Sequence, residues 1–183
     1  MSIEFNKIML NLLTSNEKNV VLVAKQLETI VLTNEYIRGL IEGEGCFTFC
    51  TISRFSKKLD KKIRLKIPAF LLSMHCRDKE LITAVKNHLK LKNTIYEYKK
   101  PPLISSNKEY KRGNQVMLIV REIGNLKNII VPFCYKKLKG YKRKQFEEWI
   151  EKIGNDQAVP EVYKLIYRFC HSGYYDRNPK FLE

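Results

Sequence analysis

Residues 37–45 read Ile-Arg-Gly-Leu-Ile-Glu-Gly-Glu-Gly, and this stretch decides the fold. We expect it to lie in a helix that begins after Thr33 or Asn34, since either residue can cap it. Gly39 and Gly43 are four residues apart, so they share one helix face and leave space for another backbone to approach closely. Because a glycine inside a helix costs roughly 1 kcal/mol relative to alanine, two on one face indicate that this space is used.

The carboxylate of Glu44 is expected in the last turn of this helix, where the helix dipole disfavours negative charge. A chain that places an acid there gives up stability, which points to another role for it. A divalent cation would supply that role, because such ions prefer carboxylate and carbonyl oxygens. Gly45 is expected to follow in a left-handed conformation that ends the helix.

Beyond the motif the apolar period changes from that of a helix to that of a strand. Residues 46–54 alternate, with Phe47 and Phe49 on one face. The other expected elements are helices over 16–31, 78–91, 122–131, 141–153 and 160–170, and strands over 64–75, 94–99 and 115–120. The segments 56–62 and 100–114 are predicted to be basic loops without regular structure, Pro132 a turn, and the end of the chain a short polar tail.

This order of elements predicts an α+β fold with one antiparallel four-stranded sheet and helices packed on one of its faces. The other face of the sheet is then open, and the basic loops border it. Such a surface is suited to the groove of a nucleic-acid duplex.

The composition also favours a polyanionic partner. The 183 residues include 34 lysines and arginines against 19 aspartates and glutamates, which gives a formal net charge of +15. With 44% hydrophobic residues the chain is too apolar to be disordered, and its apolar runs fall far short of the roughly 18 residues that span a membrane. The five cysteines show no C-x-x-C spacing and residues 1–10 lack a secretion signal, so we expect free thiols, a reducing intracellular compartment and no membrane partner.

Residues 37–45, followed by Cys46 and Phe47, resemble the motif of the LAGLIDADG homing endonucleases, with Glu42 and Glu44 at its two acidic positions. The stretch 75–78 resembles the polar end of the family's second strand. Residues 132–133 and 139–142 resemble the turn and the basic segment before its later helix. The resemblance implies the family's αββαββα fold in a core over 34–154. Residues 1–33 are then an N-terminal helical extension, and residues 155–183 a C-terminal helix and tail.

The resemblance also implies an activity. It predicts a site-specific, metal-dependent homing endonuclease that makes double-strand breaks with short 3′ overhangs at a long palindromic or nearly palindromic site of the intron-insertion type. Glu44 is then the metal ligand, the carbonyl of Gly45 is a second donor, and the active-site basic residue is Lys142, with Lys139 as its rival. The expected ion is Mg²⁺ or Mn²⁺, and Ca²⁺ would occupy the site without supporting cleavage. A common active-site glutamine of the family falls on Met74, which cannot orient water.

Contacts with double-stranded DNA are expected from the open sheet face and the loops. If Phe47 and Phe49 face the core, alternation directs four residues of the first strand to the groove, and the third strand adds an outward row. These groove residues are Thr48, Cys50, Ile52 and Arg54, together with Tyr96, Tyr98 and Lys100. Loop residues expected to contact phosphate are Lys57, Lys58, Lys61, Lys62, Lys108, Lys111 and Arg112. Arg64, His75 and Arg77 complete the set, and His75 or Arg77 could replace the missing glutamine.

One motif implies two chains. Metal-assisted phosphodiester hydrolysis commonly uses two cations about 4 Å apart. Each motif helix supplies one principal carboxylate, and this sequence contains one such helix. We therefore expect a homodimer whose interface is formed by Arg38, Gly39, Glu42 and Gly43. Because self-association through one patch is symmetric, the DNA target is expected to be palindromic or nearly so.

The alternative function is that of a maturase, which binds intron RNA and assists splicing instead of, or besides, cleaving DNA. Charge and sheet would be the same in both cases. Non-cleaving members of the family can lose the acidic position, whereas Glu44 and Lys142 are both present here. The family is typical of introns, which places the protein in an organelle (chloroplast or mitochondrion) or with the genome of the host intron.

Overall fold

The computed structural model describes residues 31–56, 60–99, 103–105, 108–110 and 113–181. The helix predicted over 16–31 lies outside these residues, apart from its last position. The chain divides into two units after Val31, and the second unit, Leu32–Glu183, is the one described below. Among the described residues, none of the helices has the length and apolar character needed to cross a membrane.

Helix α2 (Asn34–Glu44) contains the glycine motif, and Thr33 caps it by accepting a hydrogen bond from the Tyr36 amide, 3.1 Å. Ile37 and Ile41 are fully buried and anchor the helix in the core. The left-handed conformation predicted for Gly45 is wrong: its φ is −73° and its ψ 149°, so the backbone is extended. Glycine is needed there because a Cβ would lie 2.6 Å from the carbonyl oxygen of Ile41, where β1 leaves the helix.

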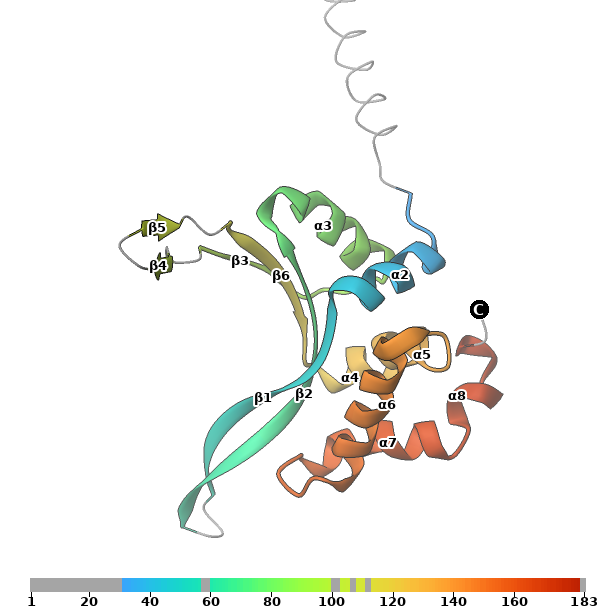
Figure 1. The fold of residues 1–183 in the computed structure, drawn as a ribbon. Coiled ribbons are helices and arrows are strands. Elements are labelled where there is room, and N and C mark those ends of the chain that lie inside the picture. Colours follow the sequence, from blue (N-terminus) through green and yellow to red (C-terminus); the bar gives the residue numbers. More distant parts are fainter. Residues whose placement is uncertain (1–30, 57–59, 100–102, 106–107, 111–112, 182–183) are drawn as a thin grey trace, which may run out of the picture. The chain divides into compact units, whose positions relative to one another are not determined.

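Four strands form the predicted antiparallel sheet, and this prediction is confirmed. They are β1 (Gly45–Ser56), β2 (Lys61–His75), β6 (Gln115–Val120) and β3 (Ile95–Tyr98), in the order β1-β2-β6-β3. β1 and β2 pair along their whole length, from Gly45 opposite Leu72 to Ser56 opposite Lys61. Only the inner half of β2 also pairs with β6, so the outer halves of β1 and β2 project as a two-stranded ribbon (Figure 1).

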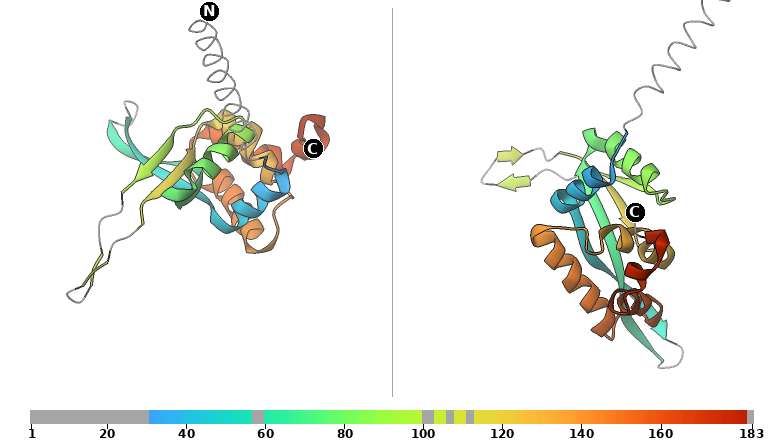
Figure 2. Two further views of the ribbon diagram at one scale, coloured as in Figure 1. Left: turned by 90° about the horizontal axis from the view of Figure 1, so that it is seen from above. Right: turned by 90° about the vertical axis from the view of Figure 1, so that its right-hand side faces the viewer.

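The helices cover one face of this sheet, as Figures 1 and 2 show. They include α3 (Lys79–His88) and α6 (Gly140–Asn155). The ring of Phe47 packs against Phe146 and Trp149 of α6, with centroid distances of 5.0 and 5.4 Å. The indole N–H of Trp149 donates to the carbonyl of Thr48, 2.8 Å. Phe47 and Phe49 therefore face the core as predicted.

The segment 100–114 is more regular than its prolines suggested. It contains β4 (Leu103–Ser105) and β5 (Lys108–Tyr110), which pair antiparallel with Leu103 opposite Tyr110. The prediction of an irregular loop is therefore wrong. Prolines 101 and 102 precede the first strand of this pair in the sequence and lie outside the described residues.

Pro132 does not make the predicted turn. Helical structure is continuous through α4 (Ile123–Asn125), the π-helix η2 (Leu126–Ile130) and α5 (Val131–Cys134), with Pro132 in the first turn of α5. Because helical structure continues through this position, the proline, which has no N–H, leaves out one backbone hydrogen bond of the helix. The wider π turn before it shifts the carbonyls that its ring would otherwise meet.

The C-terminal segment is helical rather than a polar tail. After η3 (Glu161–Tyr163) and α7 (Lys164–His171) come α8 (Tyr174–Arg177) and η4 (Pro179–Phe181). Tyr175 is buried, and its ring meets those of Tyr135, Phe169 and Phe181 at centroid distances of 5.3–6.1 Å. The aromatic residues of the tail thus extend the core.

Candidate active site and nucleic-acid interface

Two hydrogen bonds join the end of α2 to the beginning of α6. The Lys142 ammonium donates to the carbonyl oxygen of Gly45, 2.7 Å, and the Lys139 backbone N–H donates to the Glu42 carboxylate, 2.5 Å. Gly140, between the two lysines, has a φ of +55°, which glycine adopts without strain. The Glu42 carboxylate also lies at the N-terminus of α6, where the helix dipole favours negative charge. Residues 97 positions apart are thereby fixed to one another.

The structure distinguishes the two candidate lysines. Lys142 is half-buried and its ammonium reaches the last residue of the motif, whereas Lys139 contacts the motif through its backbone and its side chain is exposed. Lys142 is therefore the lysine whose charge lies beside Gly45. Glu42 serves the junction within the chain, by holding the start of α6.

The donors at the end of α2 fit half of a metal site. Glu44 is exposed and offers a carboxylate, and the adjacent Gly45 carbonyl is a second hard oxygen, already bound to Lys142. Within the described part of the chain, no three or more His, Cys, Asp or Glu side chains gather closely enough to hold an ion. A hard divalent cation held here would take its remaining ligands from water, from phosphate oxygens or from a second chain.

The glycine face of α2 is open. Among the described residues, nothing lies within 4 Å of a Cβ built on Gly39 or on Gly43, so packing in this part of the chain does not require glycine at either position. Beside them runs a groove of about 500 Å³, lined by Glu35, Arg38, Gly39, Glu42, Lys136, Lys137 and Lys139. Arg38 is engaged within the chain: its guanidinium lies 4.8 Å from the centroid of the Phe133 ring and donates to the Phe133 carbonyl, 3.2 Å.

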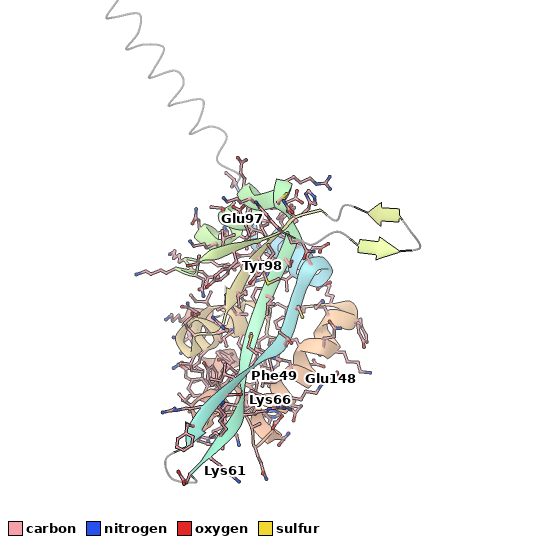
Figure 3. The ribbon with its side chains drawn as sticks, turned by 90° about the vertical axis from the view of Figure 1, so that its left-hand side faces the viewer. Phe49, Lys61, Lys66, Glu97, Tyr98 and Glu148 are labelled. Carbon is pink, nitrogen blue, oxygen red and sulfur yellow. The ribbon has the colours of Figure 1, made fainter. Side chains whose placement is uncertain are left out.

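The strand register sorts the predicted DNA contacts into two groups. Residues directly opposite in an antiparallel pair share a face, so those aligned with Thr48 lie away from the helices. This open face holds Thr48, Cys50, Ile52, Arg54, Lys61, His75, Tyr96 and Tyr98. Figure 3 views the sheet from this side, with Tyr98 and Lys61 far apart along it. Lys62 and Arg64 pair with Phe55 and Ser53 and therefore lie on the reverse face of the ribbon.

The remaining predicted contacts lie elsewhere. Arg77 follows β2 in η1 (Cys76–Asp78), is exposed, and lies 3.7 Å from the carboxylate of Asp78. Its backbone N–H donates to Nδ1 of His75, 3.2 Å. The residues Lys57, Lys58, Lys100, Lys111 and Arg112 are outside the described residues, and of Lys108 only the strand position in β5 is described.

Two polar residues of the open face were missed by the sequence analysis. Gln115 lies opposite both His75 and Tyr98, and Ser73 lies next to Leu72, the partner of Gly45. The Ser73 hydroxyl oxygen is buried and has no hydrogen-bond partner among the described residues. Met74, the position aligned with the family's glutamine, packs against the core. Strand alternation could have found Ser73, but the run of apolar residues before it hid the register.

The four strands of the sheet carry one acidic side chain, and it forms an ion pair with a lysine. Glu97 of β3 accepts a hydrogen bond from the Lys79 ammonium at 2.6 Å. This hydrogen bond lowers the pKa of the Glu97 carboxyl and raises that of Lys79. Glu97 lies opposite the buried Val116 and so belongs to the helix side of the sheet, and the open face of the four strands carries no carboxylate.

Comparisons with known proteins agree with this geometry. The family model described as LAGLIDADG endonuclease matches residues 37–153. The search of curated proteins gives no match. Among solved structures, the homing endonuclease I-TnaI matches with a TM-score of 0.53 and 19% identity over 84% of this chain and 97% of its own.

Two further solved structures contain DNA targets. The LAGLIDADG homing endonuclease I-LtrWI, bound to its target DNA, has a TM-score of 0.52 and 23% identity over 76% of this chain. I-SmaMI, bound to an uncleaved DNA target in the presence of calcium ions, has a TM-score of 0.50 and 20% identity over 77% of this chain. The present chain spans 44% of the length of each. At these identities the likeness establishes the fold.

Proposed function

The chain belongs to the LAGLIDADG endonuclease family, and on that premise we propose that it is a homing endonuclease that cleaves both strands of a long palindromic or nearly palindromic DNA site. The observation that carries this proposal is the arrangement at the end of α2. There the exposed Glu44 carboxylate adjoins a carbonyl oxygen that is bound to the Lys142 ammonium. An acid, a hard oxygen and a fixed positive charge are groups that metal-assisted phosphodiester hydrolysis uses.

Each group has one role in this scheme. Glu44 would hold a Mg²⁺ or Mn²⁺ ion through its carboxylate, and such an ion would supply activation of water and polarisation of the scissile phosphodiester. Lys142 offsets the negative charge that develops on the phosphate, and its hydrogen bond to the Gly45 carbonyl holds the ammonium in position. Glu42 positions α6, and with it Lys142, by holding the Lys139 backbone N–H. The calcium-containing complex of I-SmaMI supports a divalent ion in this scheme.

A second copy of the chain completes the site. The open face at Gly39 and Gly43 lets the α2 helix of one protomer approach that of its partner, which brings a second Glu44 to the same region. A two-fold axis between the helices requires two related half-sites on the duplex. The predicted palindromic target follows from this symmetry.

The sheet of each protomer would lie in the major groove of its half-site, because a β-ribbon fits that groove. The solved complexes of I-LtrWI and I-SmaMI with their DNA targets support this partner. The ribbon residues Arg54, Lys61, Lys62 and Arg64 would contact the phosphates that border the groove. Several phosphate contacts predict a steep fall of affinity with salt concentration.

A cleavage assay tests the proposal. The wild-type protein and the Glu44→Gln variant are incubated with Mg²⁺ and a library of randomised palindromic duplexes, and cleaved molecules are sequenced. We expect double-strand breaks at a related set of sites with wild type, and at least a 100-fold slower reaction with Glu44→Gln at unchanged DNA affinity. Equal rates for the two proteins would refute the role of Glu44. Intron RNA binding without any cleavage would favour the maturase function instead.

A further inference from the structure

The middle of the open sheet face is apolar. Six large side chains lie there by register: Ile52, Leu65, Ile67, Leu71, Met117 and Ile119, which we call the apolar strip. They alternate along the strands with the residues that pack against the core, such as Phe70 and Leu72, and so point the other way. Between them lie the small residues Thr48, Cys50 and Ala69.

Charge on the four strands is confined to one end. Their five basic residues, Arg54, Lys61, Lys62, Arg64 and Lys66, all lie in the projecting ribbon. Their one acidic residue, Glu97, is bound to Lys79. The apolar strip thus adjoins a basic ribbon but contains no charged side chain. A polyanion that the ribbon attracts would meet an uncharged, apolar surface in the middle of the face, before the polar residues Ser73, His75 and Gln115 at its other end.

A DNA major groove offers one apolar group, the C5-methyl of thymine, and apolar side chains recognise it. Guanine is read chiefly by bidentate arginine or lysine, and the strip offers neither. From this match we infer that the protein recognises a block of T·A base pairs in each half-site through thymine methyl groups that contact the apolar strip. The inference rests on the proposed function and adds the base composition of the target.

Replacement of thymine by uracil tests this directly, because it removes the methyl group and leaves every hydrogen-bonding atom of the base in place. Sites selected from the randomised library are resynthesised with deoxyuridine within the block, or with deoxyuridine only outside it. We expect selected sites to be rich in T·A pairs where the strip lies. Each contacted methyl that is removed should weaken binding about fourfold, the contribution of one buried methyl group. Deoxyuridine outside the block should leave affinity unchanged.

Two exposed apolar residues of β1 provide matched variants. Ile52 belongs to the apolar strip and is 41% exposed, whereas Phe55, 56% exposed, lies on the reverse face of the ribbon. Threonine suits a strand at both positions and neither side chain supports the core, so both variants should fold. Ile52→Thr should abolish the sensitivity to uracil at one position per half-site, and Phe55→Thr should retain all of it.

Each other outcome has a definite reading. Specific binding that is insensitive to uracil, or selected blocks rich in G·C pairs, would overturn the inference and leave the endonuclease proposal intact. This would be the result if a second copy or another segment of the chain covered the strip. Failure of the full-length protein to bind or cleave any duplex in the library would overturn the proposed function itself.

Discussion

The end of α2 and the projecting β1–β2 ribbon differ in how they are held. At the junction of α2 with α6, Lys139 and Lys142 each donate a hydrogen bond to the end of the motif. The same helices are anchored by the buried residues Ile41, Phe146 and Trp149. The ribbon is exposed from Thr51 to Phe55. Lys66 of β2 joins it to the segment after α6 through two contacts, which we call the ribbon brace. There the Lys66 amide donates to the carbonyl of Ala158, 2.9 Å, and its ammonium binds Asp156, 2.7 Å.

This contrast matches the two tasks we assign to the regions. Cleavage requires groups held within about half an ångström of their working positions, which a packed helix junction provides. Recognition of a long duplex needs a surface that can follow the groove, and a lightly braced ribbon can adapt to it. Substitutions at the junction should therefore affect the rate of cleavage, and substitutions at the ribbon should affect binding.

The largest effect is expected from Gly39→Leu. Because the site of its Cβ is open within the chain, the monomer should be stabilised by up to about 1 kcal/mol, the helix propensity that glycine lacks. The same side chain should block the approach of a partner helix and reduce double-strand cleavage by more than 100-fold. Thermal unfolding and a plasmid cleavage assay measure the two changes. Gly124→Leu, at an equally open glycine in α4, is the control and should cleave normally. Normal cleavage by Gly39→Leu would show that the glycine face of α2 is not the dimer interface.

A smaller effect is expected from Lys142→Met. It removes the ammonium beside Gly45 and should slow single-turnover cleavage about 100-fold, while the dissociation constant for DNA changes less than threefold. Lys144→Met, at an exposed position of the same helix, should cleave at the wild-type rate. If Lys139→Met proved as slow as Lys142→Met, the distinction drawn between the two lysines would be wrong.

The smallest effect is expected at the ribbon brace. The hydrogen bond that the Lys66 ammonium donates to the Asp156 carboxylate holds the pKa of this carboxyl below its usual value near 3.9. A lowered folded-state pKa means that the brace stabilises the structure above about pH 4 and is lost as the pH falls further, through the folded-state pKa. Hydrogen exchange of the Lys66 amide, corrected for intrinsic rate, should rise over that range. Asp156→Asn should show no such rise, and because the ion pair is partly exposed to solvent, the thermal unfolding midpoint should change little.

Local patterns in the sequence were enough for the framework of the fold. The strand at 46–54 followed from alternation, and a cap at Thr33 or Asn34 followed from residue type, of which the structure uses Thr33. What they could not supply were details set by neighbours in space. Gly45 is glycine because β1 passes close to Ile41, and Pro132 is tolerated because a π turn precedes it. Arg54 and Arg64 lie on opposite faces of the ribbon. This could not be predicted, because β2 is apolar on both faces and its sequence does not fix the strand register.

The candidate site shows the same division. Glu44 stood out because an acid at a helix C-terminus is unfavourable without a partner. Lys142 and Gly45 are 97 positions apart, and only the family resemblance, not any local pattern, placed both in one site. The hydrogen bond between them was not predicted. The hydroxyl of Ser73 was missed because its strand is apolar on both faces, so alternation did not fix the face on which it lies.

The central claim is that two copies of the α2 helix bring two Glu44 carboxylates to one duplex. Sedimentation equilibrium of the wild-type protein with its selected duplex in Ca²⁺, followed by addition of Mg²⁺ to the same sample, tests it most directly. We expect a protein mass of about twice 21.6 kDa on each duplex, and double-strand breaks once Mg²⁺ is added. A complex that contains a single chain and still breaks both strands would contradict it.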